Sequence, residues 1–327
     1  MMTRNLKVFF VSFGASLFLW WGMNVLSASL TEFFFLHDLR TNPETLAANA
    51  ARLNLEQKLR AEYPLAKKGA QRLELQARSV LALYIKEAGA TKVLFEKNSE
   101  TPLPIASITK LMTSLVAVKN YGSEERITIT PEILETSGSA GQMRPGDVFT
   151  VKDLLYLALM ESSNDAAVAL TKPLGAQEFV VLMNNEAAYL NLRNTSFVNP
   201  TGLDEASQNN SSTAKDLTQL TYYLLENYPQ VFDILSQSEL TLFTPNRVFH
   251  HTMRNTNELL EYYYEWPAKT LGGKTGTTPQ ARQTLLLVVE SPDHAGYIIN
   301  VILGSEDRLR EMRQLLQWIL QSYQWHT

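Results

Sequence analysis

The sequence contains no cysteine in its 327 residues and no large excess of charge of either sign. Without thiols, disulfides, zinc thiolates and a cysteine nucleophile are all excluded. The formal net charge of −4 gives no reason to expect nucleic acid as a partner. The five histidines form no His-Glu-x-x-His pattern, and the adjacent His250 and His251 are expected to point apart on a strand. We therefore expect no metal ion and no cofactor.

The N-terminus carries an apolar run that is long enough to cross a membrane. Arg4 and Lys7 precede an uncharged stretch from Val8 to Leu30. About 20 apolar residues span a bilayer, whereas the core of a signal peptide has roughly 7–15. We therefore expect residues 1–30 to form a transmembrane helix with a cytoplasmic N-terminus and an exported body. Ser27-Ala-Ser leaves open a cleavage site and a secreted product.

Residues 31–76 are predicted to form a helical stalk or linker, and residues 77–327 a compact domain. Asn42-Pro43-Glu44 is a typical helix start, and Pro64 would end that helix. The alternative is that this segment packs on the body as an extra helix. With 45% hydrophobic and 19% charged residues, the chain is typical of a globular protein that buries a core.

Within the compact domain, strand-like runs lie near both ends and helical patterns lie between them. Strands are expected at 79–86, 93–97, 239–243, 269–271, 282–290 and 296–304, and helices at 107–120, 151–160, 176–190, 212–227 and 308–323. Thr150 or its neighbour is expected to cap the second helix. This order predicts an α+β fold, with a sheet covered by helices and a helical subdomain inserted at about 105–240.

A serine and a lysine stand three residues apart at the start of the first helix, in Ser107-Ile-Thr-Lys110. At that spacing both side chains lie on one helix face, within reach of each other. A serine becomes a good nucleophile when a base takes its proton, and an unprotonated lysine amine is such a base. Ser212-Thr-Ala-Lys215 fits the same pattern, but we interpret it as a helix N-cap.

Two later motifs distinguish these pairs. Ser162-Ser-Asn164 follows the 151–160 helix, and Lys274-Thr-Gly276 leads toward the 282–290 strand. The order Ser-x-x-Lys, Ser-x-Asn, Lys-Thr-Gly is that of the active-site motifs of serine β-lactamases and penicillin-binding proteins. Of the two Ser-x-x-Lys pairs, only the one at Ser107 precedes both later motifs. A second Ser-x-Asn match at Ser207 is interpreted as turn chemistry.

The resemblance extends beyond the motifs, from about Ala77 to the C-terminus. The stretches at 104–113, 144–155, 163–167 and 199–204 resemble the low-molecular-mass penicillin-binding proteins, and more narrowly the D-alanyl-D-alanine carboxypeptidases of peptidoglycan maturation. The resemblance implies a mostly antiparallel sheet in a β-lactamase/DD-peptidase-like fold. It also implies stem peptides ending in D-Ala-D-Ala as substrates and β-lactams as inhibitors. The expected location is the cell membrane, with the catalytic domain outside the cytoplasm.

The resemblance also implies roles for the reactive residues. Ser107 would form the acyl-enzyme and Lys110 would be its base, with a pKa lowered by burial, by the helix N-terminus and by Lys274. Ser162 would relay a proton to the leaving amine. Asn164 would hold Lys110 and the substrate amide.

The third motif is implied to bind the substrate. Lys274 and Thr275 would hold the terminal carboxylate, and Gly276 would let the substrate backbone lie close to the strand edge. The N–H groups of Ser107 and Thr277 would form the oxyanion hole. The family commonly has an Ala-Gly pair where this chain has Ala281-Arg282, so an arginine there is expected to affect the substrate groove.

Three other functions remain as alternatives. A serine β-lactamase shares the motifs, but the Glu-x-x-Leu-Asn sequence of class A enzymes is not found after the Ser-x-Asn motif. An endopeptidase acting on D-Ala–diamino-acid cross-links would use the same residues. A non-catalytic cell-wall binding protein usually loses a catalytic residue. The polar stretch from Arg254 to Asn257 is a further candidate for substrate contact.

Overall fold

The computed structural model describes residues 64–325, apart from 87–88, 139, 207 and 261–265, together with scattered positions between 13 and 52. The chain divides into two compact units, Met1–Glu62 and Tyr63–Thr327. The predicted anchor and most of the predicted stalk lie outside the described residues. Among the helices that are described, none has the length and apolar character needed to cross a bilayer.

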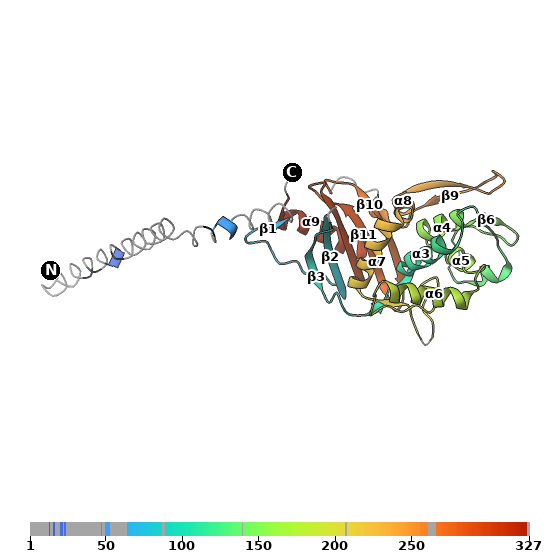
Figure 1. Ribbon diagram of the computed structural model, residues 1–327, viewed down its shortest axis with the longest axis horizontal. Helices are drawn as coiled ribbons and strands as arrows, with labels where there is room; N and C mark the ends of the chain where they lie inside the picture. Colours follow the sequence, from blue (N-terminus) through green and yellow to red (C-terminus); the bar gives the residue numbers. More distant parts are fainter. Residues whose placement is uncertain are drawn as a thin grey trace, which may run out of the picture. The chain divides into compact units, whose positions relative to one another are not determined.

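A five-stranded antiparallel sheet forms the centre of the second unit (Figure 1). In spatial order its strands are β10 (Thr270–Thr278), β11 (Arg282–Glu290), β12 (Gly296–Ser305), β2 (Ser79–Lys86) and β3 (Thr91–Lys97). The predicted strands at 79–86 and 282–290 are confirmed to the residue. β10 is an edge strand, so one side of its backbone is free of the sheet.

The sheet has two apolar faces because its central strands contain unbroken apolar runs, such as residues 285–289 of β11. Along β11, Leu285 and Leu287 belong to one core and Leu286 and Val288 to the other, since successive side chains point to opposite faces. Helix α9 (Arg308–Ser322) packs on the first face. The other face is covered by α7 (Ala214–Asn227), α8 (Pro229–Leu235) and the helical subdomain.

The helical subdomain lies between β3 and β10 in the sequence. Its longer elements are η1 (Ala106–Thr109), α3 (Lys110–Asn120), α4 (Val151–Met160), α5 (Asn164–Ala169) and α6 (Ala176–Tyr189). Its shorter elements are β4 (Leu103–Pro104), β5 (Arg126–Thr128), η2 (Pro131–Glu135), β6 (Val148–Thr150), β7 (Ser211–Ser212) and η3 (Glu258–Leu260).

Helix caps account for where two of these helices begin. Thr150 caps α4, as predicted, and it forms a reciprocal capping box with Asp153. Helix α7 begins at Ala214, two residues later than predicted, and its cap is Thr213 rather than Ser212. Ser212 lies instead in β7, which pairs with β4.

The compact domain begins before residue 77, contrary to the expected boundary. β1 (Leu65–Ala66) pairs with β13 (Tyr323–Gln324), and residues 67–76 form a turn and irregular structure without a helix. The backbone N–H of Ala77 donates to Glu311 of α9. These contacts fix residues 64–76 on the body, so the last part of the predicted stalk belongs to the domain.

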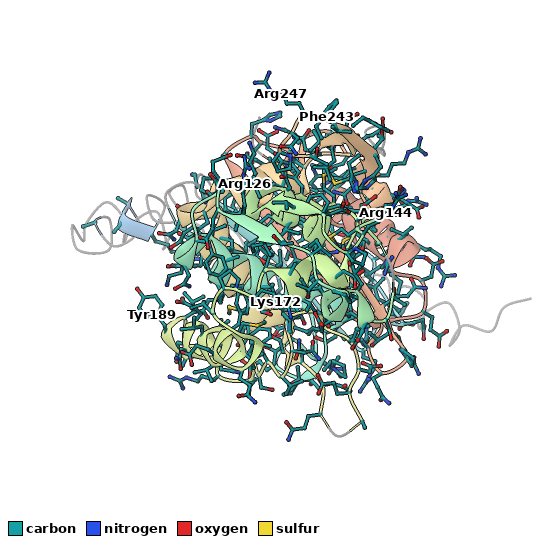
Figure 2. The ribbon with its side chains drawn as sticks, turned by 90° about the vertical axis from the view of Figure 1, so that its right-hand side faces the viewer. Arg126, Arg144, Lys172, Tyr189, Phe243 and Arg247 are labelled. Atoms are coloured by element: carbon teal, nitrogen blue, oxygen red, sulfur yellow. The ribbon has the colours of Figure 1, made fainter. Side chains whose placement is uncertain are left out.

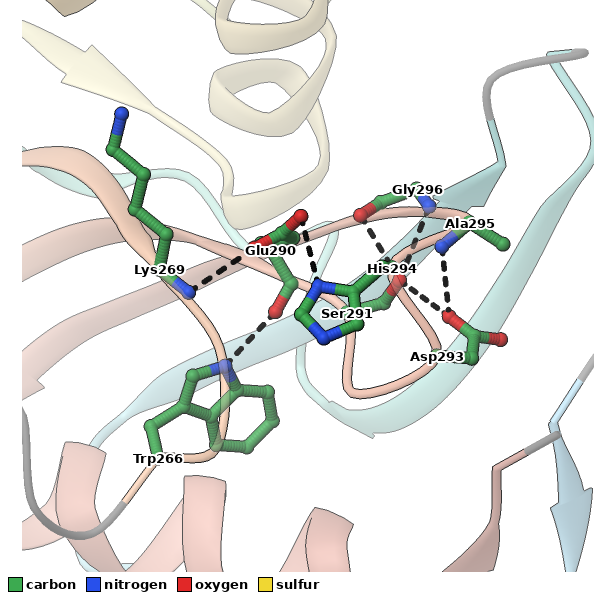
Figure 3. Close-up of polar contacts among 8 residues, drawn as sticks. All are labelled: Trp266, Lys269, Glu290, Ser291, Asp293, His294, Ala295 and Gly296. Carbon is green, nitrogen blue, oxygen red and sulfur yellow. Dashed lines mark hydrogen bonds and ion pairs between the residues drawn. The ribbon is translucent and has the colours of Figure 1, made fainter. Parts of the chain in front are cut away.

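The turn between β11 and β12 is held by side chains that also fix the approach to β10 (Figure 3). Trp266 Nε1 donates to the carbonyl of Glu290 at 2.9 Å, and the N–H of Lys269 donates to its carboxylate at 3.2 Å. His294 lies 3.0 Å from the same carboxylate. Trp266 is buried. These contacts therefore fix the position of the backbone just before the edge strand β10.

A two-stranded hairpin, β8 (Glu239–Phe243) and β9 (Phe249–Arg254), projects at the subdomain end (Figure 1). His250 and His251 were expected to point apart, but their Nδ1 atoms lie 2.6 Å from each other. Leu242 pairs with His251 and Phe243 with Phe249, so His250 is the extra residue of a bulge. A bulge breaks the alternation of side chains, which explains the error.

Candidate active site

Ser107 lies in η1, in a turn that is packed too tightly for ordinary side chains. The preceding Ala106 has φ +48, an unfavourable conformation for a residue with a Cβ. A Cβ on Gly202 would lie 1.9 Å from the carbonyl oxygen of Ala106. A Cβ on Gly276 would lie 2.9 Å from the backbone nitrogen of Ser107. Two distant glycines therefore let a loop and the β10 edge close on the serine.

Lys110 is fully buried and points its amine at three oxygen atoms. Its Nζ lies 2.9 Å from Ser107 Oγ, 2.7 Å from Asn164 Oδ1 and 2.8 Å from the carbonyl oxygen of Thr201. The latter two oxygens can only accept hydrogen bonds, whereas the serine hydroxyl can also donate one. A neutral amine has two N–H groups and one lone pair. This arrangement therefore directs the lone pair at the serine proton.

The surroundings favour the neutral form of Lys110. Burial, and secondly the charge of Lys274, hold the pKa of Lys110 well below its usual range. Among the described residues, no acidic side chain forms an ion pair with either lysine. The expected direction and two of its three expected causes are therefore confirmed.

The Thr201 carbonyl is fixed by a loop of side-chain to backbone hydrogen bonds. Asn199 Oδ1 accepts from the N–H groups of Thr201 and Gly202 at 3.2 and 2.8 Å. Asn210 Nδ2 joins this loop to the nucleophile turn, because it donates to the Asn199 carbonyl and to Thr109 Oγ1. The sequence motif at 199–204 thus orients an acceptor for Lys110.

Ser162 lies between α4 and α5 in a strained conformation, with φ +63. Its Oγ accepts a hydrogen bond from Lys274 Nζ at 3.0 Å. The preceding Glu161 is held by His251, whose Nε2 lies 3.0 Å from its carboxylate. Strain of this kind persists only where neighbouring contacts over-determine it. His251 is therefore a positioning residue for the Ser162 turn, and nothing in the sequence pattern indicated it.

Asn164 has two partners in the structure. Its Oδ1 accepts from Lys110, and its Nδ2 donates to the carbonyl of Ser137 at 2.8 Å. The predicted contact with Lys110 is thus observed. One Nδ2 proton is engaged by the protein itself, so at most the other is available to a substrate amide.

Lys274 is the second buried lysine of the site, on the edge strand β10. Burial, and secondly the charge of Arg308, lower its pKa to about 7. Besides Ser162, its Nζ donates to the carbonyl of Thr275 at 3.1 Å. A group with a pKa near neutrality can hold a proton and also release it, which suits the transfer of protons to a neighbouring hydroxyl.

The edge of β10 presents several donors near one another. Arg308 Nη1 donates to the carbonyl of Gly276 at 2.8 Å and to Thr277 Oγ1 at 2.7 Å. The hydroxyls of Thr256 and Thr275 lie 2.6 Å apart. Together with Lys274, these groups give the strand edge a positive character that suits an anionic ligand.

Arg308 and Thr256 are the residues of this edge that the motifs did not reveal. Arg308 lies 32 positions beyond Gly276, at the start of α9, where a basic residue carries no catalytic signature. Thr256 belongs to the polar stretch 254–257, which was a candidate for substrate contact and does reach Thr275.

Arg282 has φ +57, which explains why a glycine is favourable at this position. Its side chain is half-exposed and lies 3.4 Å from Glu306. The nearby turn is instead fixed by Asp204, which accepts from Thr278 Oγ1 and from the N–H of Gln280.

Comparisons with known proteins agree with this geometry. A family model described as D-alanyl-D-alanine carboxypeptidase matches residues 66–307. The D-alanyl-D-alanine endopeptidase of Pseudomonas aeruginosa is 33% identical over 235 residues, covering 70% of this chain and 73% of that protein. The D-alanyl-D-alanine carboxypeptidase DacC of Escherichia coli is 32% identical over 273 residues, covering 78% and 64%.

A solved structure with the same fold is penicillin-binding protein D2 from Listeria monocytogenes in its ampicillin-bound form. The TM-score is 0.65 at 28% identity, and the match covers 76% of this chain and 100% of that chain. The family model alone spans well over half of the sequence. The chain therefore belongs to the D-alanyl-D-alanine carboxypeptidase family of serine peptidases.

Proposed function

We propose that this chain is a serine-type D-Ala-D-Ala carboxypeptidase that removes the terminal D-alanine from peptidoglycan stem peptides and is acylated by penicillin. The observation that carries the proposal is the environment of Lys110. Its amine is buried, has no acidic partner among the described residues and lies 2.9 Å from Ser107 Oγ. A lysine in this state serves as a general base.

Acylation follows from these contacts. Lys110 takes the proton of Ser107, whose oxygen attacks the carbonyl of the penultimate D-alanine. The N–H groups of Ser107 and Thr277 stabilise the oxyanion, and loss of one such donor typically costs about 2.7–4 kcal/mol of barrier. Gly276 supports this role, because its missing side chain lets the β10 edge lie against Ser107.

The leaving amine needs a proton as the C–N bond breaks. Ser162 is the donor that the geometry favours, with Lys274 hydrogen-bonded behind it at 3.0 Å. The proton that Lys110 took from Ser107 replaces the one that Ser162 gave to the amine, so Lys110 is neutral again. Water then attacks the ester, Lys110 takes a proton from it, and that proton passes to Ser107 Oγ as the ester C–O bond breaks. The stem peptide is released one residue shorter, and Ser107 regains its hydroxyl.

The terminal carboxylate is assigned to Lys274, Thr275 and Thr277, with Arg308 supporting the edge from behind. These groups are donors or cations, and Arg308 already bonds Thr277 Oγ1. A substrate that ends in a carboxylate therefore gains charge-assisted hydrogen bonds that an internal peptide bond cannot offer.

The test is release of D-alanine from a diacyl-Lys-D-Ala-D-Ala peptide by the purified chain, with Ser107→Ala as the matched variant. We expect release by the native chain and loss of it in the variant. A fluorescent penicillin should form a stable adduct that Ser107→Ala lacks, whereas rapid turnover of the drug would indicate a β-lactamase. Undiminished release by Ser107→Ala would overturn the assignment.

The location proposed for the enzyme is the membrane, with the catalytic domain outside the cytoplasm. The support is the apolar stretch from Val8 to Leu30 behind Arg4 and Lys7. Fractionation of cells that express the full chain, with and without protease added outside the membrane, tests this. Recovery in the cytosolic fraction would contradict the proposal.

A further inference from the structure

Two adjacent histidines of β9 lie against the turn that carries Ser162. The Nδ1 atoms of His250 and His251 are 2.6 Å apart. His251 Nε2 lies 3.0 Å from the carboxylate of Glu161, the residue that immediately precedes Ser162. Both histidine side chains are largely buried, with exposed fractions of 12% and 6%. A change in the state of either ring is therefore felt by the strained turn.

The segment that follows the hairpin is also bonded to this turn through the backbone. The N–H of Thr256 donates to the carbonyl of Met160 at 3.0 Å. This bond holds the end of α4, and the contact with His251 holds the side chain of the next residue, Glu161. The two contacts together keep the backbone of Ser162 at φ +63, a conformation that persists only where its surroundings fix it.

The contacts also determine which ring nitrogens carry protons. A carboxylate oxygen can only accept, so His251 Nε2 carries a proton and donates it to Glu161. In a neutral His251 the Nδ1 atom then has a lone pair, which accepts from the Nδ1–H of His250. The Nε2 atom of His250 is left with a lone pair, 4.0 Å from Asp147 Oδ2 and beyond hydrogen-bond distance. The neutral pair therefore forms a directed chain of hydrogen bonds from His250 to Glu161.

This chain of hydrogen bonds accepts one additional proton and excludes a second. The first proton goes to His250 Nε2, where it faces Asp147, and the bond between the two rings is kept. The second proton has to go to His251 Nδ1, which carries the last lone pair. Two N–H groups then face each other across 2.6 Å between two cations, so the rings must separate. Separation of the rings moves His251 away from Glu161.

The surroundings keep the pair neutral near pH 7. Burial, and secondly the charge of His251, lower the pKa of His250, and Arg144 acts in the same direction. Asp147 and Glu161 act in the opposite direction and are outweighed. The first proton therefore enters the pair at a lower pH than it would enter an ordinary histidine. The second enters at a lower pH still, because it joins a cation.

The pair lies close enough to the surface to exchange protons with the solvent. The side chain of Asp147 is 30% exposed. Figure 2 shows Arg144, from the same loop, on the face turned to the viewer, with Phe243 and Arg247 of the hairpin tip above it. The charge of the pair can therefore follow the pH of the medium while the domain stays folded.

We propose that His250 and His251 form a positioning pair that holds Ser162 through Glu161 and releases it when the pair takes its second proton. This inference rests on the proposed function, in which Ser162 protonates the leaving amine. Once Glu161 is released, the turn leaves its strained conformation and Ser162 Oγ moves away from Lys274 Nζ, which now donates to it at 3.0 Å. The amine is then protonated more slowly. The enzyme thus loses activity in acidic surroundings because Ser162 is misplaced.

The experiment compares pH profiles of kcat/KM for D-alanine release between pH 5 and pH 7, each relative to its own value at pH 7. In His250→Gln the amide can donate to His251 or accept from it, so both charge states of that ring are tolerated. We expect the native profile to fall below that of His250→Gln by about three- to tenfold at pH 5. Protonation of Lys110 lowers activity in both proteins alike, so the ratio of the two profiles isolates the pair.

A second variant and a control separate positioning from a purely structural role. His251→Phe removes the donor to Glu161, so kcat should fall about tenfold at every pH while KM changes less than about twofold. His294→Gln removes a histidine whose side chain is 62% exposed, and it should keep the native profile. Urea denaturation at pH 7 shows whether each variant is folded. Coincident profiles of the native chain and His250→Gln would overturn the inference.

The proton positions give a readout that needs no activity. Imidazole nitrogen-15 chemical shifts at pH 8 report the tautomer of each ring. We expect His250 to carry its proton on Nδ1 and His251 to carry its proton on Nε2. Protons on Nε2 of both rings would overturn the inference, whatever the enzyme acts on. If the native chain releases no D-alanine at any pH, the proposed function fails, and the tautomers alone then decide whether the pair is built as inferred.

Discussion

Two stretches of this chain carry the same Ser-x-x-Lys pattern in opposite environments. Lys110 is buried among Ser107 Oγ, Asn164 Oδ1 and a backbone carbonyl. The side chain of Lys215 is 62% exposed and forms an ion pair with Glu100. Ser212, the serine of the second pair, is buried against Thr195 Oγ1 at 2.7 Å.

The two environments shift the pKa values of the two lysines in opposite directions. Burial lowers the pKa of Lys110, whereas the hydrogen bond that Lys215 donates to Glu100 raises the pKa of Lys215. Only a lysine that loses its proton easily can take one from serine. The spacing of the motif therefore brings a serine and a lysine within reach of each other. The lysine becomes a base only where it is buried away from water and from acidic partners.

The largest expected effect is that of Lys110→Met, which keeps the bulk and removes the amine. Loss of a general base typically lowers the rate by about 10²–10⁴-fold. The rate of acylation by fluorescent penicillin should therefore fall by a factor in that range, whereas Lys215→Met should change the rate by less than about twofold. Equal losses in both variants would show that the buried environment does not distinguish the two pairs.

Gly202→Ala tests whether the nucleophile turn needs its tight packing. The new Cβ would overlap the carbonyl oxygen of Ala106, so we expect a loss of about 3 kcal/mol in unfolding free energy and slower acylation. The control is Gly146→Ala, which has φ +90 but no neighbour within 4 Å of the new Cβ. It should cost only the conformational term of about 1–2 kcal/mol. Urea denaturation of both variants measures the difference, and equal losses would mean that the turn relaxes freely.

Lys274 predicts a pH limit on activity. Its pKa of about 7 means that it loses its proton as the pH rises through 7, and both carboxylate binding and proton donation through Ser162 need the protonated form. For the free enzyme we expect kcat/KM to fall above pH 7 by up to about tenfold per pH unit. Lys274→Arg keeps its charge and should lack this decline. A native profile that is flat from pH 7 to 9 would refute the role.

The elements with a clear hydrophobic pattern could be predicted from the sequence. The apolar runs of β2, β11 and β12 were identified as strands from the sequence pattern alone, as was the buried helix that follows Ser107. The edge strand β10 was recognised only at its start, because Gly272-Gly-Lys-Thr-Gly has no hydrophobic alternation. Its form is set by pairing with β11.

The rest of the site depends on contacts between distant residues. Thr201 contributes a backbone carbonyl, which leaves no mark on residue type. Arg308 reaches β10 from the start of α9. The side chain of His251 was placed wrongly because the alternation of residues along a strand does not predict a bulge. The sequence motifs therefore identified the reacting groups, whereas the residues that position those groups could be identified only from the folded structure.

The smallest expected effect concerns stability and returns to the two lysines. The folded pKa of Lys110 is lowered, so between that value and the unfolded value of about 10.4 the unfolded chain binds more protons. Stability should therefore rise with pH across this interval, and the cost of burying Lys110 should be fully present below it. At pH 7, Lys110→Met should unfold at a higher urea concentration than the native chain, with a free energy of unfolding that is larger by about 0.5–2 kcal/mol. The stability of this variant should also rise less than that of the native chain between pH 7 and pH 9. Lys215→Met, with its lysine already in water, should keep the native pH dependence. If Lys110→Met is less stable than the native chain at pH 7, the buried amine stabilises the fold, and the contrast between the two pairs would be one of chemistry alone.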